Sequence, residues 1–311
     1  MHILKRHKLL IMLATAVHLL SACNKEKQED VKKDFTLAAR VQSLDYGGTS
    51  IWGTEAELGV FVTKPGTQDV TEGNFNLEYR TTFQTKATRL EATDDKMNLP
   101  DNGELVDIAL YYPYNPELSS KEDRKTIYDV DLKNQNARIP DILLVGMENG
   151  CNTTINSATI TLRPVFAKLN VRLKNNITTK SSTEDIKIEL VNIPCKSEID
   201  VLTGEYLSYG TLESTEMMKP LENIYAYEAI LLAHKLDKNA ILRVIFSNSA
   251  DLETMEIPLR EHMREIKQNL QYDLEVTVSP EGIKATLVSM SEFSISDWYE
   301  DMEDIYGNIK N

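Results

Sequence analysis

Apolar and polar side chains alternate with a period of two along much of this chain. Residues 166–173 carry an apolar side chain at every second position, with polar residues such as Lys168 between them. Residues 185–193 and 272–278 repeat the pattern. Because successive side chains of a strand point to opposite faces of a sheet, these segments predict antiparallel strands with one buried and one solvated face.

Other segments are apolar on both faces and predict strands that lie centrally or under a second sheet. These segments are residues 58–62, 106–112, 142–145, 225–232 and 241–246. Helical periodicity is scarce. The two candidate helices, residues 259–268 and 297–305, are short, and the second is acidic enough to be a tail instead. We therefore predict an all-β fold built from β-sandwiches rather than a parallel α/β fold.

The length of the chain and the distribution of its loops suggest two domains. A chain of 311 residues with 41% apolar side chains has material for about two cores of ordinary size. Loop residues are frequent in the first half, for instance at 94–104 and 115–125, and the second half alternates more regularly. We place an N-terminal domain at residues 35–160 and a C-terminal domain at residues 161–311.

The first 22 residues have the order of a secretory signal peptide. The basic residues Lys5, Arg6 and Lys8 precede an apolar run at 9–20, and small residues follow. The run has 12 residues, whereas a helix that spans a bilayer needs about 20. We therefore predict that residues 1–22 are removed on export rather than kept as a membrane anchor.

Residues 20–23, Leu-Ser-Ala-Cys, resemble the bacterial lipobox. The resemblance implies cleavage between Ala22 and Cys23 and the attachment of acyl chains such as palmitate to Cys23. Each buried methylene contributes about 0.8 kcal/mol, so two or more chains hold a domain firmly at a membrane. The alternative is an ordinary secretory cut that leaves Cys23 as a free thiol.

The residues that follow Cys23 are almost all charged, so residues 23–34 predict a solvated tether. This acidic stretch also resembles the signal that directs lipoproteins of the Bacteroides group to the outer face of the outer membrane. The resemblance implies a lipid-anchored protein at the cell surface, with the lipid on Cys23 as its one covalent addition and no other cofactor.

The net charge argues against nucleic-acid binding, and the cysteine content leaves open whether the mature protein has a disulfide. The formal net charge of −14 becomes −17 without residues 1–22, which carry three positive charges and no acidic ones. A surface of this sign repels phosphate backbones, which argues against nucleic-acid binding. After lipidation two cysteines remain, Cys151 and Cys195. They can either form a disulfide in the oxidising periplasm or stay as buried thiols.

The sequence carries no signature of catalysis or of a metal site. It has no nucleophile elbow, zinc-protease motif or phosphate-binding loop. Glu253 and Glu256 are close in sequence, but spacing alone cannot place two carboxyl groups for glycoside hydrolysis. His234 and His262 lack carboxylates at metal-ligand spacing. One acidic loop without an ordered calcium-binding repeat contains Asp94, Asp95, Asp101 and Glu104.

Several short segments, taken in order along the chain, resemble one known family. They are residues 59–61, 106–115 with a Tyr-Pro-Tyr-Asn turn, 141–144, 162–171, 199–204, 269–274 and 295–298. In these segments the chain resembles the fimbrillins, the subunits of type V pili in bacteria of the Bacteroides group. It departs from the family at Arg163 and Pro164, where a histidine is usual. The resemblance implies two tandem transthyretin-like β-sandwich domains and a role in assembling or decorating fimbriae.

The resemblance also implies assembly by strand exchange. A sandwich that lacks one strand exposes unpaired N–H and C=O groups beside an apolar groove, which a segment of another subunit can fill. In the family, a protease that cuts after an arginine removes the first strand and opens this groove. The matching residue here is Arg40, which Val41 follows. The alternative is that Arg40 is a solvent-facing strand residue.

A donor segment for this exchange should be apolar, alternating and close to the C-terminus. Residues 283–295 fit this description. The donor side chains would be Ile283, Ala285, Leu287, Phe293 and Ile295. The alternative is that the segment is the last strand of the C-terminal domain, with Trp298 in its own core. The sequence leaves open whether the protein is a stalk, anchor or tip subunit.

The rival hypothesis is a surface lipoprotein that binds glycans for a polysaccharide-uptake system. The aromatic residues available as platforms are Trp52, Tyr111, Tyr112, Tyr114, Tyr206 and Tyr209. An aromatic residue in an alternating strand belongs to a core more often than to a sugar site. For a fimbrial protein, the expected partners are other fimbrial subunits, the outer membrane through the lipid, and a host or microbial surface ligand.

Overall fold

The computed structural model describes nine stretches of the chain. They are residues 35–42, 56–82, 88–120, 126–137, 140–175, 186–219, 226–246, 254–279 and 282–293. Within these stretches no helix has the length and apolar character needed to cross a membrane. The predictions that fall outside them concern the signal peptide, the tether, residues 297–305 and the residues Ala22, Cys23, Trp52, Glu253, Ile295 and Trp298.

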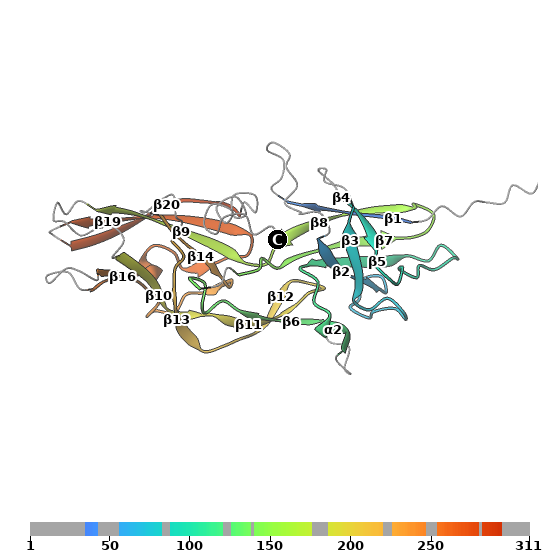
Figure 1. The fold of residues 1–311 in the computed structure, drawn as a ribbon, viewed down its shortest axis with the longest axis horizontal. Helices are drawn as coiled ribbons and strands as arrows, with labels where there is room; N and C mark the ends of the chain where they lie inside the picture. The colour runs from blue at the N-terminus through green and yellow to red at the C-terminus, as the bar shows by residue number, and fades with distance from the viewer. Residues whose placement is uncertain are drawn as a thin grey trace, which may run out of the picture. The chain divides into compact units, whose positions relative to one another are not determined.

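Seven strands from the first part of the chain form a closed β-barrel (Figure 1). In chain order they are β1 (Thr36–Val41), β2 (Glu57–Thr63), β3 (Leu77–Thr81), β4 (Thr88–Ala92), β5 (Val106–Tyr112), β7 (Leu144–Cys151) and β8 (Ser157–Pro164). Around the barrel the order is β1-β4-β3-β2-β5-β7-β8. Every neighbouring pair is antiparallel except β1 and β8, whose parallel pairing closes the barrel.

The two segments predicted to be apolar on both faces near the start, residues 58–62 and 106–112, form β2 and β5. Both strands lie in the barrel core with nearly all of their side chains buried. Gly59 is paired with Tyr111, and a Cβ atom at Gly59 would come within 1.8 Å of the Tyr111 ring. Glycine therefore makes room for this ring, whose hydroxyl donates a hydrogen bond to Asn76 Oδ1 at 2.6 Å.

Two four-stranded sheets form the C-terminal body. Their orders are β14-β9-β19-β20 and β13-β10-β16-β17. The strands are β9 (Ala167–Asn175), β10 (Ile186–Pro194), β13 (Leu212–Glu216), β14 (Ala226–Leu231), β16 (Ile241–Phe246), β17 (Thr254–Pro258), β19 (Leu270–Ser279) and β20 (Gly282–Glu292). Apolar residues of both sheets meet in one buried cluster. The strands predicted from alternation at residues 166–173, 185–193 and 272–278 are thus confirmed as β9, β10 and β19.

A three-stranded sheet connects the barrel with the C-terminal body. Its strands, in spatial order, are β12 (Glu205–Tyr209), β11 (Lys196–Asp200) and β6 (Ile127–Asp131). In the sequence β6 lies between the barrel strands β5 and β7, yet it pairs with β11 (Figure 1). The remaining small elements are α2 (Glu117–Ser120), β15 (His234–Lys235), η2 (Leu259–Glu261) and β18 (Glu265–Ile266).

The all-β class is confirmed in the described part of the chain, with one helix prediction wrong. Residues 259–268 contain only the short η2 turn and β18, which pairs with β15. Leu259, Met263 and Ile266 are buried in the C-terminal core at spacings of four and three residues, which imitate one face of a helix. The tandem transthyretin-like arrangement and the domain boundary near residue 160 stay predictions.

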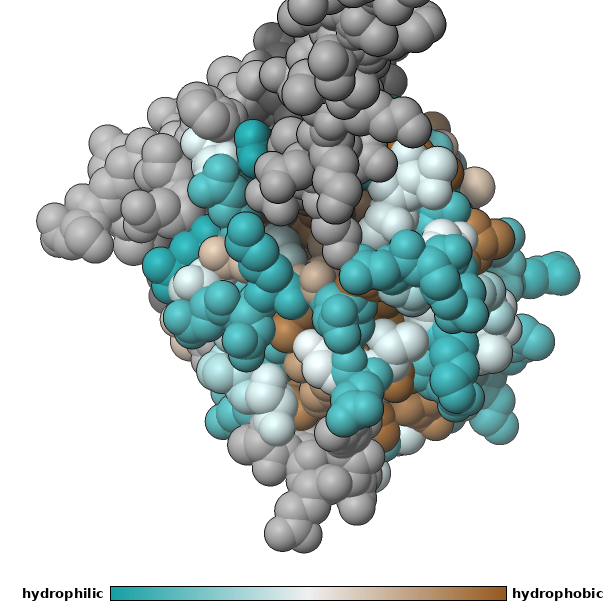
Figure 2. Space-filling model, turned by 90° about the vertical axis from the view of Figure 1, so that its right-hand side faces the viewer, coloured by the Kyte–Doolittle hydropathy of each residue, from teal (hydrophilic) through white to brown (hydrophobic). Residues whose placement is uncertain are grey.

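The polar positions of the alternating pattern mostly face solvent. Figure 2 shows hydrophilic residues over much of the coloured surface of one face, with apolar patches between them. The prediction that Lys168 is solvated is nevertheless wrong, because this residue is 1% exposed. Its ammonium group lies 3.1 Å from Glu228 Oε2, on the neighbouring strand β14. The two charges are buried together, so each compensates the other.

We predict that Lys168→Met lowers the free energy of unfolding by about 3–5 kcal/mol, because it removes the positive charge that lies 3.1 Å from the buried Glu228 carboxylate. Urea denaturation of the full chain measures the change. The double variant Lys168→Met/Glu228→Leu removes both charges and should regain most of the lost stability. A single variant as stable as the wild type would contradict the importance of this ion pair.

Candidate functional site

Strand β1, which contains the predicted processing site, fills a slot between β4 and β8. Its inward side chains Leu37, Ala39 and Val41 are between 0% and 4% exposed. On one side β1 pairs in parallel with β8 over its full length, and on the other its residues 37–39 pair with β4. Removal of this strand would leave an apolar groove with an unpaired strand on each side.

Arg40 is exposed near the end of β1, as the solvent-facing alternative predicted. Its Nε donates a hydrogen bond to Thr161 Oγ1 on β8 at 2.7 Å. Among the described residues, the bond between Arg40 and Val41 is paired with β8 and lies beyond residues 37–39, which pair with β4. The centre of β1 is therefore held on both sides, and the peptide bond that a protease would cut lies at the end of this doubly paired region.

The predicted donor segment forms β20, which pairs with β19 from residue 282 to residue 292. Ala285 and Phe293 are buried, and Ile283 and Leu287 are half-buried against the C-terminal core. Val288 lies at an irregularity in the pairing and is 63% exposed. In this structure the segment is thus the last strand of its own sheet.

The structure brings the two predicted assembly segments together at their ends. The Gln42 side-chain amide, directly after β1, donates a hydrogen bond to Glu292 Oε1 at 3.4 Å. The following residue, Phe293, donates its N–H to the Asn269 carbonyl at 3.0 Å. The end of β20 therefore lies beside the end of the slot that β1 fills, although the segments are far apart in sequence.

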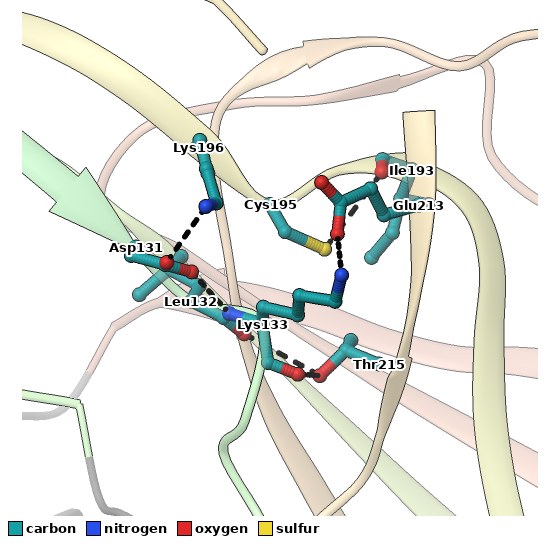
Figure 3. Close-up of polar contacts among 8 residues, drawn as sticks. All are labelled: Asp131, Leu132, Lys133, Ile193, Cys195, Lys196, Glu213 and Thr215. Atoms are coloured by element: carbon teal, nitrogen blue, oxygen red, sulfur yellow. Dashed lines mark hydrogen bonds and ion pairs between the residues drawn. The ribbon is translucent and has the colours of Figure 1, made fainter. Parts of the chain in front are cut away.

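Of the two alternatives left open for Cys151 and Cys195, the structure has the buried free thiols and not the disulfide. Cys151 ends the barrel strand β7, whereas Cys195 lies between β10 and β11. Burial, with smaller contributions from nearby carboxylates, raises the pKa of each thiol to about 11. The Cys195 Sγ lies 3.8 Å from the Ile193 carbonyl oxygen (Figure 3).

Figure 3 shows two ion pairs around Cys195 where β6 meets the C-terminal body. Lys133 lies 2.6 Å from Glu213, and this contact raises the lysine pKa. Lys196 lies 3.1 Å from Asp131. Partial burial raises the pKa of Asp131, but the Lys133 N–H and the Lys196 ammonium outweigh it and hold that pKa below its ordinary value.

Three of the candidate platform residues, Tyr111, Tyr206 and Tyr209, pack against or bind other parts of the chain. Tyr111 is fully buried, so the prediction that it could act as a platform is wrong. Tyr206 and Tyr209 stack, with ring centroids 5.4 Å apart and planes inclined by 10°. Their hydroxyl groups donate hydrogen bonds to the carbonyls of Val165 and Ala233 at 2.6 and 2.5 Å. This pair fastens β12 to the neighbouring loops.

The acidic and histidine side chains considered as sites do not converge in the described residues. No group of three or more histidine, cysteine, aspartate or glutamate residues there is arranged to hold a metal ion. Glu256 forms an ion pair with Arg243 at 2.9 Å. His234 Nδ1 lies 2.7 Å from the Leu232 carbonyl oxygen, and burial lowers the histidine pKa.

Sequence reasoning missed Gln135, which covers an edge of the C-terminal body. Its amide oxygen accepts the Ile230 N–H at 2.7 Å, and its amide nitrogen donates to the Ile230 carbonyl at 2.8 Å. Ile230 lies on β14, the edge strand of its sheet. A single glutamine outside the predicted strands gives no pattern, so the sequence offers no signal for this contact.

Comparisons with known proteins give one family and a set of similar folds. The profile of a family described as fimbrillin-like matches residues 40–298. A putative cell adhesion protein from Bacteroides uniformis is 17% identical with a TM-score of 0.66, over 84% of this chain and 98% of that one. Its counterpart from Bacteroides ovatus is 15% identical with a TM-score of 0.65, over the same shares.

The tip fimbrial protein Mfa3 from Porphyromonas gingivalis, with a C-terminal truncation, is also similar. It is 11% identical with a TM-score of 0.52, over 84% of this chain and 100% of that one. None of the curated proteins matches the chain in sequence. At these identities the structural likeness shows the fold alone.

We predict that Cys151 and Cys195 react slowly with a thiol reagent while the protein is folded. A thiol with a pKa of about 11 is about a thousandth ionised at pH 8, and the thiolate is the reactive form. Labelling at increasing pH, measured by mass spectrometry, should accelerate about tenfold per pH unit. Because folding raises these pKa values, their contribution to stability should be lost as the pH rises from about 9 to about 11.

In urea both thiols should react at the rate of an ordinary cysteine. Two unreactive sulfurs in urea that become reactive only after reduction would instead show a disulfide.

Proposed function

This chain belongs to the fimbrillin-like family, and from that premise we propose that it is a fimbrial subunit or accessory protein assembled by strand exchange. The position of β1 carries the proposal. This strand closes the barrel with Leu37, Ala39 and Val41 turned inward, so its loss would open a groove for the strand of another subunit. Cleavage after Arg40 would release β1 except for Val41, which would become the new N-terminus. It would also separate the subunit from anything attached to its former N-terminus.

The unassembled protein would hold both ends of the exchange in paired form. β1 occupies its own slot with a partner on each side, and β20 is paired with β19 as the edge strand of its own sheet, so the slot of the barrel is filled before processing. The ends of the two segments lie together at Gln42 and Glu292. This proximity supports the proposal that strand exchange begins at the end of the barrel slot, beside the end of β20.

We further propose that Cys23 carries lipid and holds the unprocessed protein at the outer membrane. The lipobox-like residues 20–23 support this anchor, and family membership supports a place in the cell-surface fimbrium. Cleavage after Arg40 would cut the chain between the lipid and the barrel. Lipid attachment would keep the subunit at its assembly site, and processing would release it into the fibre.

The glycan-binding hypothesis has less support. The stacked Tyr206 and Tyr209 are the best remaining platform, but both hydroxyl groups already bind backbone carbonyls. A stack fastened in this way serves the attachment of β12, and a family of fimbrial proteins supports a structural or adhesive role over an enzymatic one.

We predict that an arginine-specific protease cuts the folded chain to give a new N-terminus at Val41, followed by a ladder of oligomers on a gel. Arg40→Ala should remove both the new N-terminus and the ladder, because the protease needs the arginine. N-terminal sequencing and native electrophoresis measure the outcome.

Arg89→Ala is the matched control for this experiment, since Arg89 is another half-exposed barrel arginine, on the adjacent strand β4. It should leave cleavage and oligomers unchanged. Efficient cleavage between Arg40 and Val41 without any oligomers would argue against strand exchange. No cleavage of this bond would argue against Arg40 as the processing site.

We predict that Cys23→Ala moves the protein out of the outer-membrane fraction and abolishes incorporation of labelled palmitate, because one signal peptide without acyl chains gives no lasting anchor. Cell fractionation with a radiolabelled fatty acid measures both. Cys151→Ala changes a buried thiol and should leave the anchor intact. Palmitate on the Cys23→Ala protein would contradict this assignment.

A further inference from the structure

The position of β6 makes the chain cross between the barrel and the C-terminal body three times. Tyr112, Leu144 and Pro164 are paired across the adjacent strands β5, β7 and β8, so these three strand ends lie side by side. The chain stays on the barrel from Tyr112 to Ser119, whose hydroxyl accepts a hydrogen bond from Asn76. By Thr126 it lies on the C-terminal body, and at Leu144 it is back in the barrel. At Pro164 it leaves again for β9. If β6 stayed with the barrel, only the last of these crossings would exist.

Backbone pairing holds β6 on the C-terminal body. All five residues of β6 are paired with β11, from Ile127 opposite Asp200 to Asp131 opposite Lys196. The pairing continues at both ends. Thr126 accepts the Val201 N–H at 2.8 Å, and the Leu132 N–H donates to the Cys195 carbonyl at 2.7 Å. A segment encoded inside the barrel sequence thus belongs by its hydrogen bonds to the C-terminal body.

Side chains reinforce this attachment directly after β6 (Figure 3). Thr215 on β13 donates its hydroxyl to the Lys133 carbonyl at 2.8 Å. The Lys133 ammonium lies 2.6 Å from Glu213 on the same strand. The contacts therefore join β6 to a second sheet of the C-terminal body as well as to β11.

Gln135 completes the attachment on the opposite sheet. Its amide satisfies both backbone groups of Ile230, and both residues are essentially buried. Within four residues of its end, β6 is thus tied to β11, to β13 and to β14, which lie in three different sheets. Separation of the barrel from the C-terminal body would have to break all of these contacts.

We propose that β6 with residues 132–135 is a clamp that makes the barrel and the C-terminal body open as one cooperative unit. Its use rests on the proposed fimbrial function, because a subunit in a fibre transmits tension from one neighbour to the next. With the clamp closed, three chain crossings share that tension. With the clamp open, the single crossing at residues 165–166 bears it alone.

Hydrogen exchange of the full mature chain in increasing urea tests the clamp without any fibre, so its result is independent of the test of strand exchange. In the wild type, peptides from β5 and from β16 should open with the same free energy and the same urea dependence. Gln135→Ala leaves the Ile230 backbone groups unpaired and should raise exchange in β6 at least about tenfold. The opening free energies of β5 and β16 should then diverge.

Tyr227→Phe is the matched control, because it removes a buried side-chain hydrogen bond to the Ile186 carbonyl inside the C-terminal core. It should leave β5 and β16 coupled. Should Gln135→Ala fail to fold, Glu213→Gln removes the ion pair to Lys133 and should shift exchange in the same direction by a smaller factor.

A disulfide lock tests the clamp from the opposite direction. Asp129 and Glu198 are directly opposite in the antiparallel pairing of β6 with β11, where Cα atoms are about 4.5–5.5 Å apart and within disulfide range. Asp129→Cys/Glu198→Cys, once oxidised, should restore the coupling that Gln135→Ala removes. Unequal opening of β5 and β16 in the wild type, or full coupling in both weakened variants, would overturn the proposal.

Discussion

The pairing of strand edges decides how this chain folds. The N–H and C=O groups along an edge strand need hydrogen-bond partners, and other segments of the chain can supply them. The barrel meets this need by closing on itself through the parallel pair β1 and β8. In the C-terminal body, the Gln135 amide pairs with Ile230 on the edge strand β14. In both cases the partner is distant in sequence: β1 pairs with β8, and Gln135 pairs with Ile230. The pairing of strand edges therefore brings distant parts of the chain into contact.

The strand that closes the barrel is also the strand whose loss would make the subunit reactive. While β1 is in place the barrel has no edge. Without it, β4 and β8 would both be open beside the positions of Leu37 and Ala39, which β1 keeps buried. Under the proposed function, a single cut would convert a closed barrel into an acceptor, and the subunit would offer no barrel groove to other subunits before that cut.

The clamp around β6 addresses a different need, the transmission of force within one subunit. In a fibre of subunits joined by exchanged strands, the same tension passes through every subunit, so the contact that opens at the lowest force limits the strength of the fibre. Here the barrel and the C-terminal body share β6, the contacts of Lys133 and the amide of Gln135. The architecture thus combines a replaceable strand at one place with a multiply attached strand at another.

Local patterns predicted much of the fold and part of the candidate site. Alternation identified β9, β10 and β19, and two-sided apolar runs identified β2 and β5, because these patterns depend only on which faces of a strand are buried. Arg40 and the 283–295 segment were selected from sequence. The structure places Arg40 in β1, and it places the described residues 283–293 in β20 and the residue that follows it. The same reasoning failed at residues 259–268, where core contacts at helical spacing belong to a turn and a short strand.

Tertiary structure alone decided what those strands pair with. Period two cannot distinguish a lysine in water from Lys168 beside Glu228, since the counter-charge lies on another strand 60 residues away in sequence. It cannot show that β6 leaves the barrel for β11, or that Gln42 meets Glu292. The sequence by itself determined the class of fold and the buried faces, because these follow from local burial. The closed barrel, the free thiols and the shared β6 depend on contacts between distant residues, which only the folded chain brings together.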